Sequence, residues 1–95
     1  MEKVKHTVIK KLRVKNELGL HTRPATMIVK LLQESRSEIF FTYKKERINA
    51  KSILSILMLA VQKNGLLLVE IVGEDAQETM ERLERGFEDQ FGEEF

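Results

Sequence analysis

A histidine stands at position 21, where a strand-like pattern of side chains gives way to a helix-like one. Gly19 precedes it and can adopt turn conformations that other residues rarely take. Pro24 follows it and suits the first turn of a helix, because the amide hydrogen that proline lacks would have no partner there. His21 is therefore predicted at or just before a helix N-terminus, where backbone N–H groups and the helix dipole attract an anion.

The chemistry available at this position is nucleophilic attack on phosphorus. Neutral imidazole carries a lone pair and is a nucleophile at neutral pH. A phosphorylated His21 would carry up to about two negative charges, and Arg23 would add a fixed cation with several N–H donors. The alternative is that His21 is only a helix cap or a surface residue and Arg23 a solvated first-turn residue. Both interpretations stay open on these residues alone.

The rest of the chain alternates between strand and helix patterns. Period-two or β-branched segments predict strands, whereas apolar residues at helical spacing predict helices. Lys44-Lys45 is predicted to be a turn, although it lacks the Asn-Gly signal of a tight hairpin. Asp75 and Glu78 match a capping box at the start of the last helix. The predicted strands are 8–15, 37–43, 47–50 and 66–72, and the predicted helices are 25–35, 53–61 and 76–87, the second of them ended by 63–65.

This β-α-β-β-α-β-α order predicts a two-layer α+β domain whose sheet is covered by helices on one face. The second helix has more apolar residues than one buried stripe requires, since eight of the nine residues 53–61 are apolar. Some of these side chains are expected to be exposed and to form a contact surface. Ser52, directly before this helix, is a preferred N-cap residue and needs no further explanation in that role.

Composition limits the remaining possibilities. With 95 residues the chain is expected to be one domain, residues 1–95, and it contains no cysteine and two histidines, a weak basis for a metal site. The N-terminus has no signal-peptide pattern and no apolar run reaches the roughly 20 residues of a membrane span, so a cytoplasmic protein is expected. Residues 1–51 hold 13 basic against 5 acidic residues, and residues 52–95 hold 3 against 10. A basic nucleic-acid-binding module is a remote third possibility, because no such motif is present.

Two segments of the sequence resemble the HPr family, the histidine-containing phosphocarriers of the bacterial sugar phosphotransferase system. GLHTRPA, residues 19–25, resembles the active-site signature of that family, and Ala50-Lys51-Ser52-Ile53-Leu54 resembles its regulatory-serine segment at the usual distance. The element order also matches the family, from residue 7 to about residue 91. The resemblance implies an open-faced β-sandwich, with three helices on one face of a four-stranded antiparallel sheet.

The resemblance also implies a relay. Enzyme I would pass a phosphoryl group to Nδ1 of His21, and His21 would pass it to the IIA domain of a sugar permease. Arg23 would stabilise the phosphate together with the backbone amides of Thr22 and Arg23. The chain would be a carrier and a substrate of Enzyme I rather than an enzyme, with no cofactor or metal, and it is expected to be a monomer without membrane insertion.

Docking and regulation follow from the same resemblance. The apolar patch beside the histidine would contain Leu20, Ile53, Leu54 and Leu57 and would dock on partner proteins, and the positively charged N-terminal half of the chain would suit acidic partner surfaces. Ser52 would be phosphorylated by an HPr kinase/phosphorylase, which would control docking and contact with a transcriptional regulator. The alternative function is a regulatory HPr-like binding module controlled by Ser52 phosphorylation, with little or no role in sugar transport.

Overall fold

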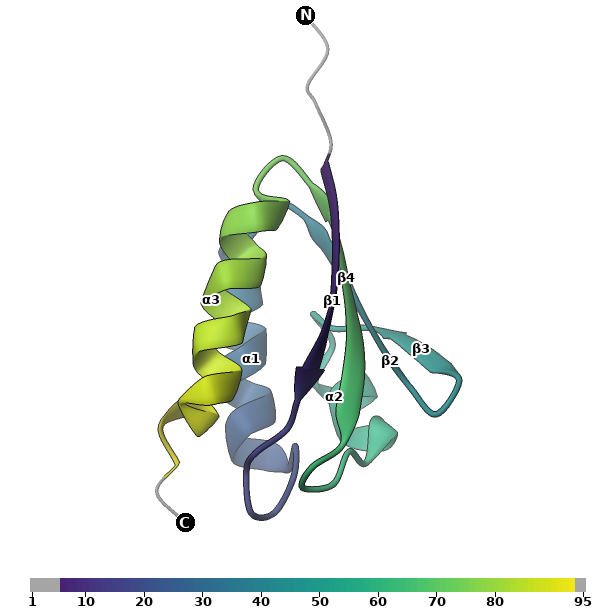
Figure 1. Cartoon of the computed structure of the whole chain (residues 1–95), viewed down its shortest axis with the longest axis vertical. Helices are drawn as coiled ribbons and strands as arrows, with labels where there is room; N and C mark the ends of the chain where they lie inside the picture. The colour runs from purple at the N-terminus through teal and green to yellow at the C-terminus, as the bar shows by residue number, and fades with distance from the viewer. Residues whose placement is uncertain (1–5, 94–95) are drawn as a thin grey trace, which may run out of the picture.

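A single four-stranded antiparallel sheet in the order β1-β4-β2-β3 organises the chain, and the computed structural model describes residues 6–93 of it. Figure 1 shows α1 and α3 side by side on one face of the sheet, while α2 packs against α1 and β3. The predicted element order and the open-faced α+β sandwich are confirmed. The strands are β1 (His6–Arg13), β2 (Glu38–Tyr43), β3 (Glu46–Asn49) and β4 (Leu66–Gly73), and the helices are α1 (Thr22–Gln33), α2 (Ile53–Leu59) and α3 (Ala76–Glu88).

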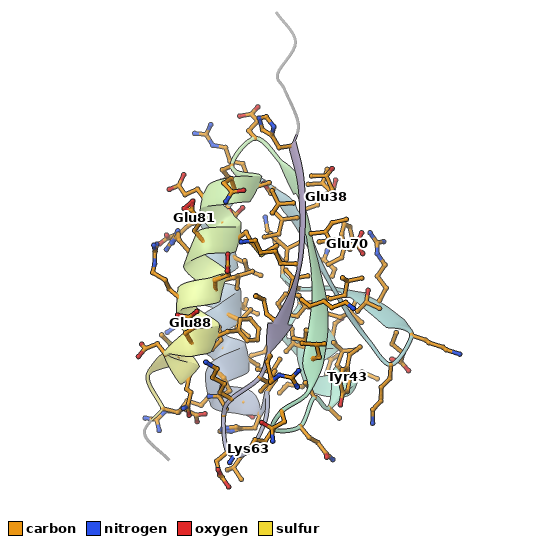
Figure 2. All side chains as sticks on the ribbon, viewed as in Figure 1. Glu38, Tyr43, Lys63, Glu70, Glu81 and Glu88 are labelled. Atoms are coloured by element: carbon orange, nitrogen blue, oxygen red, sulfur yellow. The ribbon has the colours of Figure 1, made fainter. Side chains whose placement is uncertain are left out.

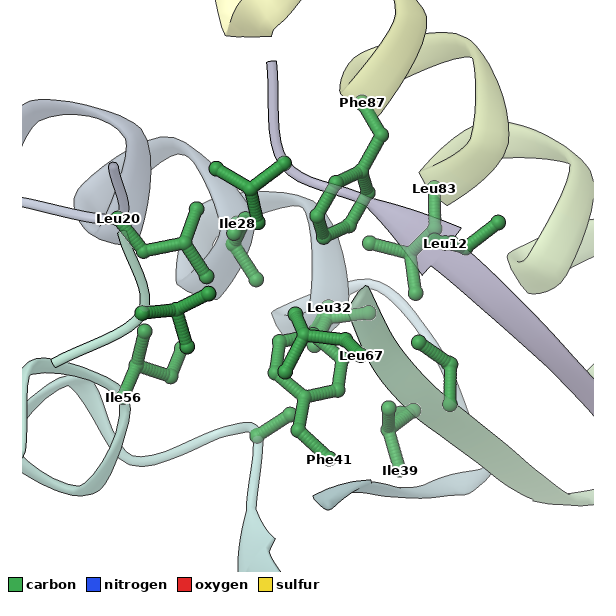
Figure 3. Packing of buried hydrophobic residues seen from close by; sticks show 14 of the residues in the cluster. Leu12, Leu20, Ile28, Leu32, Ile39, Phe41, Ile56, Leu67, Leu83 and Phe87 are labelled. Carbon is green, nitrogen blue, oxygen red and sulfur yellow. The ribbon is translucent and has the colours of Figure 1, made fainter. Parts of the chain in front are cut away.

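The core lies between the sheet and the helices. Leu67, Val69 and Ile71 of β4 alternate inward as predicted and are fully buried. Figure 3 shows Phe41 of β2 and Ile56 of α2 in the same cluster, which joins all three helices to the sheet. The opposite face of the sheet carries the alternate residues of the strands, among them Glu38 of β2 and Glu70 of β4, which are labelled in Figure 2. The core therefore fixes the helices, and with them the loops that join helices to strands, against the sheet.

The turn between β2 and β3 is tight despite its unusual sequence. Lys44 and Lys45 both have positive φ, 48° and 71°, and Tyr43 pairs with Glu46 across the turn. This backbone matches the two-residue hairpin turn in which asparagine and glycine are usual. Two lysines therefore adopt a left-handed conformation that the right-handed twist of the hairpin requires.

The second helix is shorter than predicted. It ends at Leu59 rather than continuing to Val61 and the 63–65 segment, because Ala60 takes a left-handed C-cap conformation with φ 52°. The amide of Ala60 donates to the carbonyl of Leu57 and closes the last turn. The run of apolar residues concealed this end, because Val61 is also buried although it lies outside the helix.

The capping box at α3 is also wrong. Asp75 is the N-cap residue, but its side chain makes no cap hydrogen bond. Its carboxylate instead accepts hydrogen bonds from the Ser35 and Ser37 hydroxyls and from the Arg36 amide. Glu78 is exposed on the first turn of α3. The carboxylate of Asp75 therefore connects α3 to the segment between α1 and β2.

Candidate phosphate-accepting site at the start of α1

The loop before α1 approaches the α2–β4 loop so closely that only glycine fits at position 19. Gly19 has φ +68°, and a Cβ atom added there would lie 2.1 Å from the Val61 carbonyl oxygen. The next amide, that of Leu20, donates to the same Val61 oxygen at 2.9 Å. Lys63, labelled in Figure 2, also pairs with Glu17 at 2.6 Å. These contacts fix the direction in which the chain enters α1.

His21 is the N-cap residue of α1. Its backbone is extended, with φ −75° and ψ −170°, and its carbonyl accepts the first helical hydrogen bond from Ala25 at 3.1 Å. The His21 side chain makes no cap hydrogen bond. Within residues 6–93, the structure gives no acceptor for the amides of Thr22 and Arg23. The first turn of α1 therefore offers N–H groups and the positive end of the helix dipole to an anion.

The His21 side chain is partly covered, and Nε2 is a covered nitrogen of the ring. The side chain is 30% exposed, whereas Nε2 itself is buried and lies 2.8 Å from Oε2 of Glu93. The contact has ion-pair distance. A phosphoryl donor approaching from solvent could not reach Nε2 in this conformation.

The Glu93 side chain is also buried, and a residue of the loop before α1 holds it in place. Its side chain is 1% exposed, and its Oε1 accepts a hydrogen bond of 2.6 Å from Nδ2 of Asn16. The same Asn16 nitrogen donates to the Gln90 carbonyl at 2.9 Å. Asn16 is fully buried, so the three residues Asn16, His21 and Glu93 form a connected polar cluster.

The end of the chain reaches His21 because it reverses direction after α3. Gln90, Phe91 and Gly92 all have positive φ. The Phe91 ring packs edge-on to Phe87 with centroids 5.2 Å apart, and it lies where a Cβ on Gly86 would be, 2.3 Å away. Gly86, expected only to weaken the last helix, therefore provides the space in which Phe91 anchors the turn.

Arg23 and Thr22 lie beside the ring in sequence but are not engaged with it. Both side chains are exposed in the first turn of α1. No ion pair or hydrogen bond of the Arg23 guanidinium occurs among the residues that the structure describes. The Arg23 cation is therefore accessible to an incoming anion.

Ser52 occupies the corresponding position at α2, and its side chain caps that helix. Its backbone is extended, and its Oγ accepts a hydrogen bond from the Ser55 amide at 3.2 Å. The Ser52 carbonyl accepts the first helical hydrogen bond, from Ile56 at 3.1 Å. Its place as the N-cap of the second helix is confirmed.

The apolar residues near this end of the molecule differ from the predicted set. Ile53 and Leu54 are exposed and Leu57 is half-buried. The assignment of Leu20 to the docking surface is wrong, because the positive φ of Gly19 turns its side chain into the core, where it is 2% exposed (Figure 3). Three further exposed apolar side chains that the sequence patterns did not single out as docking residues are Leu18, Met27 and Met58.

Residues 6–93 contain neither a membrane-spanning helix nor a cluster of metal ligands. Within this range, no helix has both the length and the apolar content needed to cross a membrane. No three histidine, cysteine or acidic side chains of these residues group closely enough to hold a metal ion.

A small open-faced sandwich with a histidine at the uncapped start of its first helix defines a phosphocarrier-like domain. The chain matches the family model described as the PTS HPr component phosphorylation site over residues 8–89. It is 42% identical over 80 residues to the phosphocarrier protein HPr of Chlamydia pneumoniae, covering 84% of this chain and 74% of that protein. It is 35% identical over 82 residues to that of Xylella fastidiosa, covering 86% and 92%.

The structural similarity agrees with the sequence similarity. The crystal structure of HPr-C-His from Thermoanaerobacter tengcongensis has a TM-score of 0.88 and 32% identity, covering 93% of this chain and 99% of that one. An HPr from Bacillus anthracis has a TM-score of 0.80 and 32% identity, covering 83% and 94%. The chain therefore belongs to the HPr family of phosphotransferase-system phosphocarriers. Its class is that of a carrier and not of a catalytic enzyme.

Proposed function

We propose that this protein carries a phosphoryl group on Nδ1 of His21. The observation that carries the proposal is the placement of a partly exposed imidazole at an uncapped helix start, with Nε2 buried. The amides of Thr22 and Arg23 and the exposed Arg23 guanidinium would bind the phosphate oxygens by charge-assisted hydrogen bonds. A carrier must also release its group, and a solvent-accessible anion site holds phosphate only moderately.

The donor and acceptor are proposed from the family. Enzyme I, charged by phosphoenolpyruvate, would phosphorylate His21, and the IIA domain of a sugar permease would receive the group. The relay would operate in the cytoplasm with this chain as a monomer. A similar solved structure is described as an HPr dimer from Thermoanaerobacter tengcongensis, with a TM-score of 0.73, so the oligomeric state has to be measured in the same preparation.

The docking surface is proposed to combine the apolar start of α2 with the first turn of α1. Ile53 and Leu54 are exposed, Leu57 is half-buried, and Met27 extends the apolar area along α1. Ser52 borders this surface. A phosphate on Ser52 would place about two negative charges beside the apolar side chains and would repel an acidic partner, so phosphorylation by an HPr kinase/phosphorylase is the proposed means of regulation.

Incubation with phosphoenolpyruvate and Enzyme I tests the proposal. The expected result is an acid-labile adduct on the wild-type protein that His21→Ala abolishes. His6→Ala is the matched control, because His6 is exposed in β1, away from the start of α1, and its loss should leave labelling intact. Absence of labelling, or an acid-stable adduct, would contradict the proposed function.

A further inference from the structure

The His21–Glu93 contact brings together two polar atoms that are both covered from solvent. Nε2 of His21 and Oε2 of Glu93 are 2.8 Å apart, and each has an exposed area close to zero. An ionised carboxylate offers only lone pairs. If Nε2 also presented a lone pair, the two would repel each other without water to separate them. Nε2 must therefore carry hydrogen when Glu93 is ionised.

Both carboxyl oxygens of Glu93 have a polar neighbour, Oε1 at Nδ2 of Asn16 and Oε2 at Nε2 of His21. The hydrogen bond from Asn16 Nδ2 to Oε1, at 2.6 Å, is short and is strengthened by a negative charge on the acceptor. Asn16 is in turn fixed by its second donation, to the Gln90 carbonyl. A carboxylate can accept at both oxygens, so the same group can accept from Asn16 at Oε1 and from the ring at Oε2.

We propose that Glu93, oriented by Asn16, is a positioning residue that keeps the proton of His21 on Nε2 and thereby makes Nδ1 the phosphoryl-accepting nitrogen. The part of this proposal that concerns phosphoryl acceptance rests on the proposed function, whereas the part that concerns the tautomer does not. In a neutral imidazole only one nitrogen carries hydrogen, so a protonated Nε2 leaves the lone pair on Nδ1. A carboxylate partner on the far nitrogen is the usual means of fixing a histidine tautomer.

The same contact would stabilise the phosphorylated ring. In the transfer step the Nδ1 lone pair attacks phosphorus, the bond between phosphorus and the nitrogen of a phosphoimidazole donor breaks, and its electron pair returns to the donor ring. Because Nε2 keeps its hydrogen, the His21 ring becomes positively charged, and the carboxylate of Glu93 offsets that charge. In the onward step a nucleophile of the acceptor bonds to phosphorus, the electrons of the N–P bond return to Nδ1, and the ring is neutral again. No proton has to leave Nε2 in either direction.

The end of the chain is built to hold this carboxylate in place. The left-handed turn at Gln90–Gly92 and the packing of Phe91 on Gly86 and Phe87 fix the backbone immediately before Glu93. Asn16 and Glu93 are separated by 77 residues in sequence, so the contact exists only in the folded chain. Replacement of Glu93 leaves the Phe91 anchor intact, so the variants are expected to remain folded.

The test compares Glu93→Ala and Glu93→Gln with the wild type, and uses Glu81→Gln as a matched control. Glu81 is an exposed glutamate of α3, labelled in Figure 2. Nitrogen chemical shifts of the imidazole, recorded in the unphosphorylated protein at a pH where the ring is neutral, report the tautomer. Circular dichroism checks the fold, and the rate of phosphoryl acceptance from Enzyme I is measured on the same samples.

The expected wild-type spectrum shows hydrogen on Nε2 and a lone pair on Nδ1. Glu93→Ala should raise the Nδ1–H population several-fold. Glu93→Gln keeps an acceptor oxygen but removes the charge, so it should retain the tautomer better. Both variants should lower kcat/KM for phosphoryl acceptance on the order of tenfold, and their phosphohistidine should hydrolyse more slowly at neutral pH because the ring is less readily held as a cation. Glu81→Gln should match the wild type.

A wild-type spectrum with hydrogen on Nδ1 would overturn the assignment, as would Glu93 variants that match the wild type in both tautomer and acceptance rate. Failure of the wild type to accept phosphate would refute the proposed function alone. The tautomer comparison would still decide the role of Glu93 in that case.

Discussion

The starts of α1 and α2 are built differently. At α2, the Ser52 hydroxyl accepts the Ser55 amide, so the helix satisfies one of its own N–H groups. At α1, the His21 side chain makes no cap hydrogen bond and its Nε2 contacts Glu93 instead. The side chain that could have served the helix thus leaves the first-turn amides to an incoming anion.

A third helix start extends the comparison. Asp75 at α3 has a side chain well suited to capping, yet its carboxylate bonds the segment between α1 and β2. The three N-cap side chains therefore differ in their partners: Ser52 caps its own helix, Asp75 joins two distant segments, and His21, the proposed phosphate acceptor, contacts Glu93. The residue type alone does not distinguish the three, whereas the partner of each side chain does.

Removal of the Asp75 carboxylate is expected to have the largest effect on stability. Asp75→Ala would leave the Ser35 and Ser37 hydroxyls and the Arg36 amide without their acceptor, and should lower the free energy of unfolding by about 2 kcal/mol. Urea unfolding at neutral pH measures this. A decrease in the free energy of unfolding of less than a few tenths of a kcal/mol would show that the carboxylate does not join the segments.

The same group predicts a pH dependence. Burial alone would raise the pKa of Asp75, but the hydrogen bonds from the Ser37 hydroxyl, the Arg36 amide and the Ser35 hydroxyl outweigh it and lower the pKa below its ordinary value of 3.8. The stabilisation by ionised Asp75 is therefore present above about pH 4 and is lost as the pH falls through the lowered folded-state pKa. Asp75→Asn, which cannot titrate, should lose less stability than the wild type over that range.

Replacement of Arg23 should slow phosphoryl acceptance at the start of α1 without unfolding the helix. The Arg23 guanidinium is exposed, so Arg23→Gln should leave the free energy of unfolding nearly unchanged. It should lower the rate of phosphoryl acceptance on the order of tenfold, because a charge-assisted hydrogen bond to phosphate is worth about 1.5 kcal/mol or more. Lys30→Gln, an exposed cation in the last turn of the same helix, is the control. Equal rates of phosphoryl acceptance for the two variants would show that Arg23 does not bind the phosphate.

Replacement of Ser52 at the start of α2 should have the smallest effect of these changes, and the effect should be on stability. Ser52→Ala removes the acceptor of the Ser55 amide and should lower the free energy of unfolding by about 1 kcal/mol. Ser52→Asn retains a side-chain oxygen at the same place and should recover most of the loss. Urea midpoints of the two variants decide this, and equal midpoints would mean that the cap contributes nothing measurable.

Local pattern was sufficient for most of the fold and for the position of His21. Alternation in β4 and the Gly19–Pro24 spacing are properties of neighbouring residues, and both elements form as the pattern predicts. The end of α2 was not predictable in the same way, because Ala60 is left-handed in a position where glycine or asparagine would be the usual signal.

The cluster around His21 could not be predicted because its members are distant in sequence. Nothing in Asn16 or in the acidic C-terminal segment points to a contact across 77 residues. Gln90 and Phe91 are not residues that normally indicate a left-handed turn, so the reversal that brings Glu93 to the ring has no sequence signal. Leu20 misled for a related reason, since the turn at Gly19 reverses the face on which its side chain lies.

The most direct test of the account is the nitrogen–phosphorus coupling in the nuclear magnetic resonance spectrum of the ¹⁵N-labelled protein after reaction with phosphoenolpyruvate and Enzyme I. The account predicts one phosphorylated histidine, His21, with coupling to Nδ1 and with hydrogen retained on Nε2. Coupling to Nε2, or a phosphorylated protein whose His21 signals are unchanged, would contradict it.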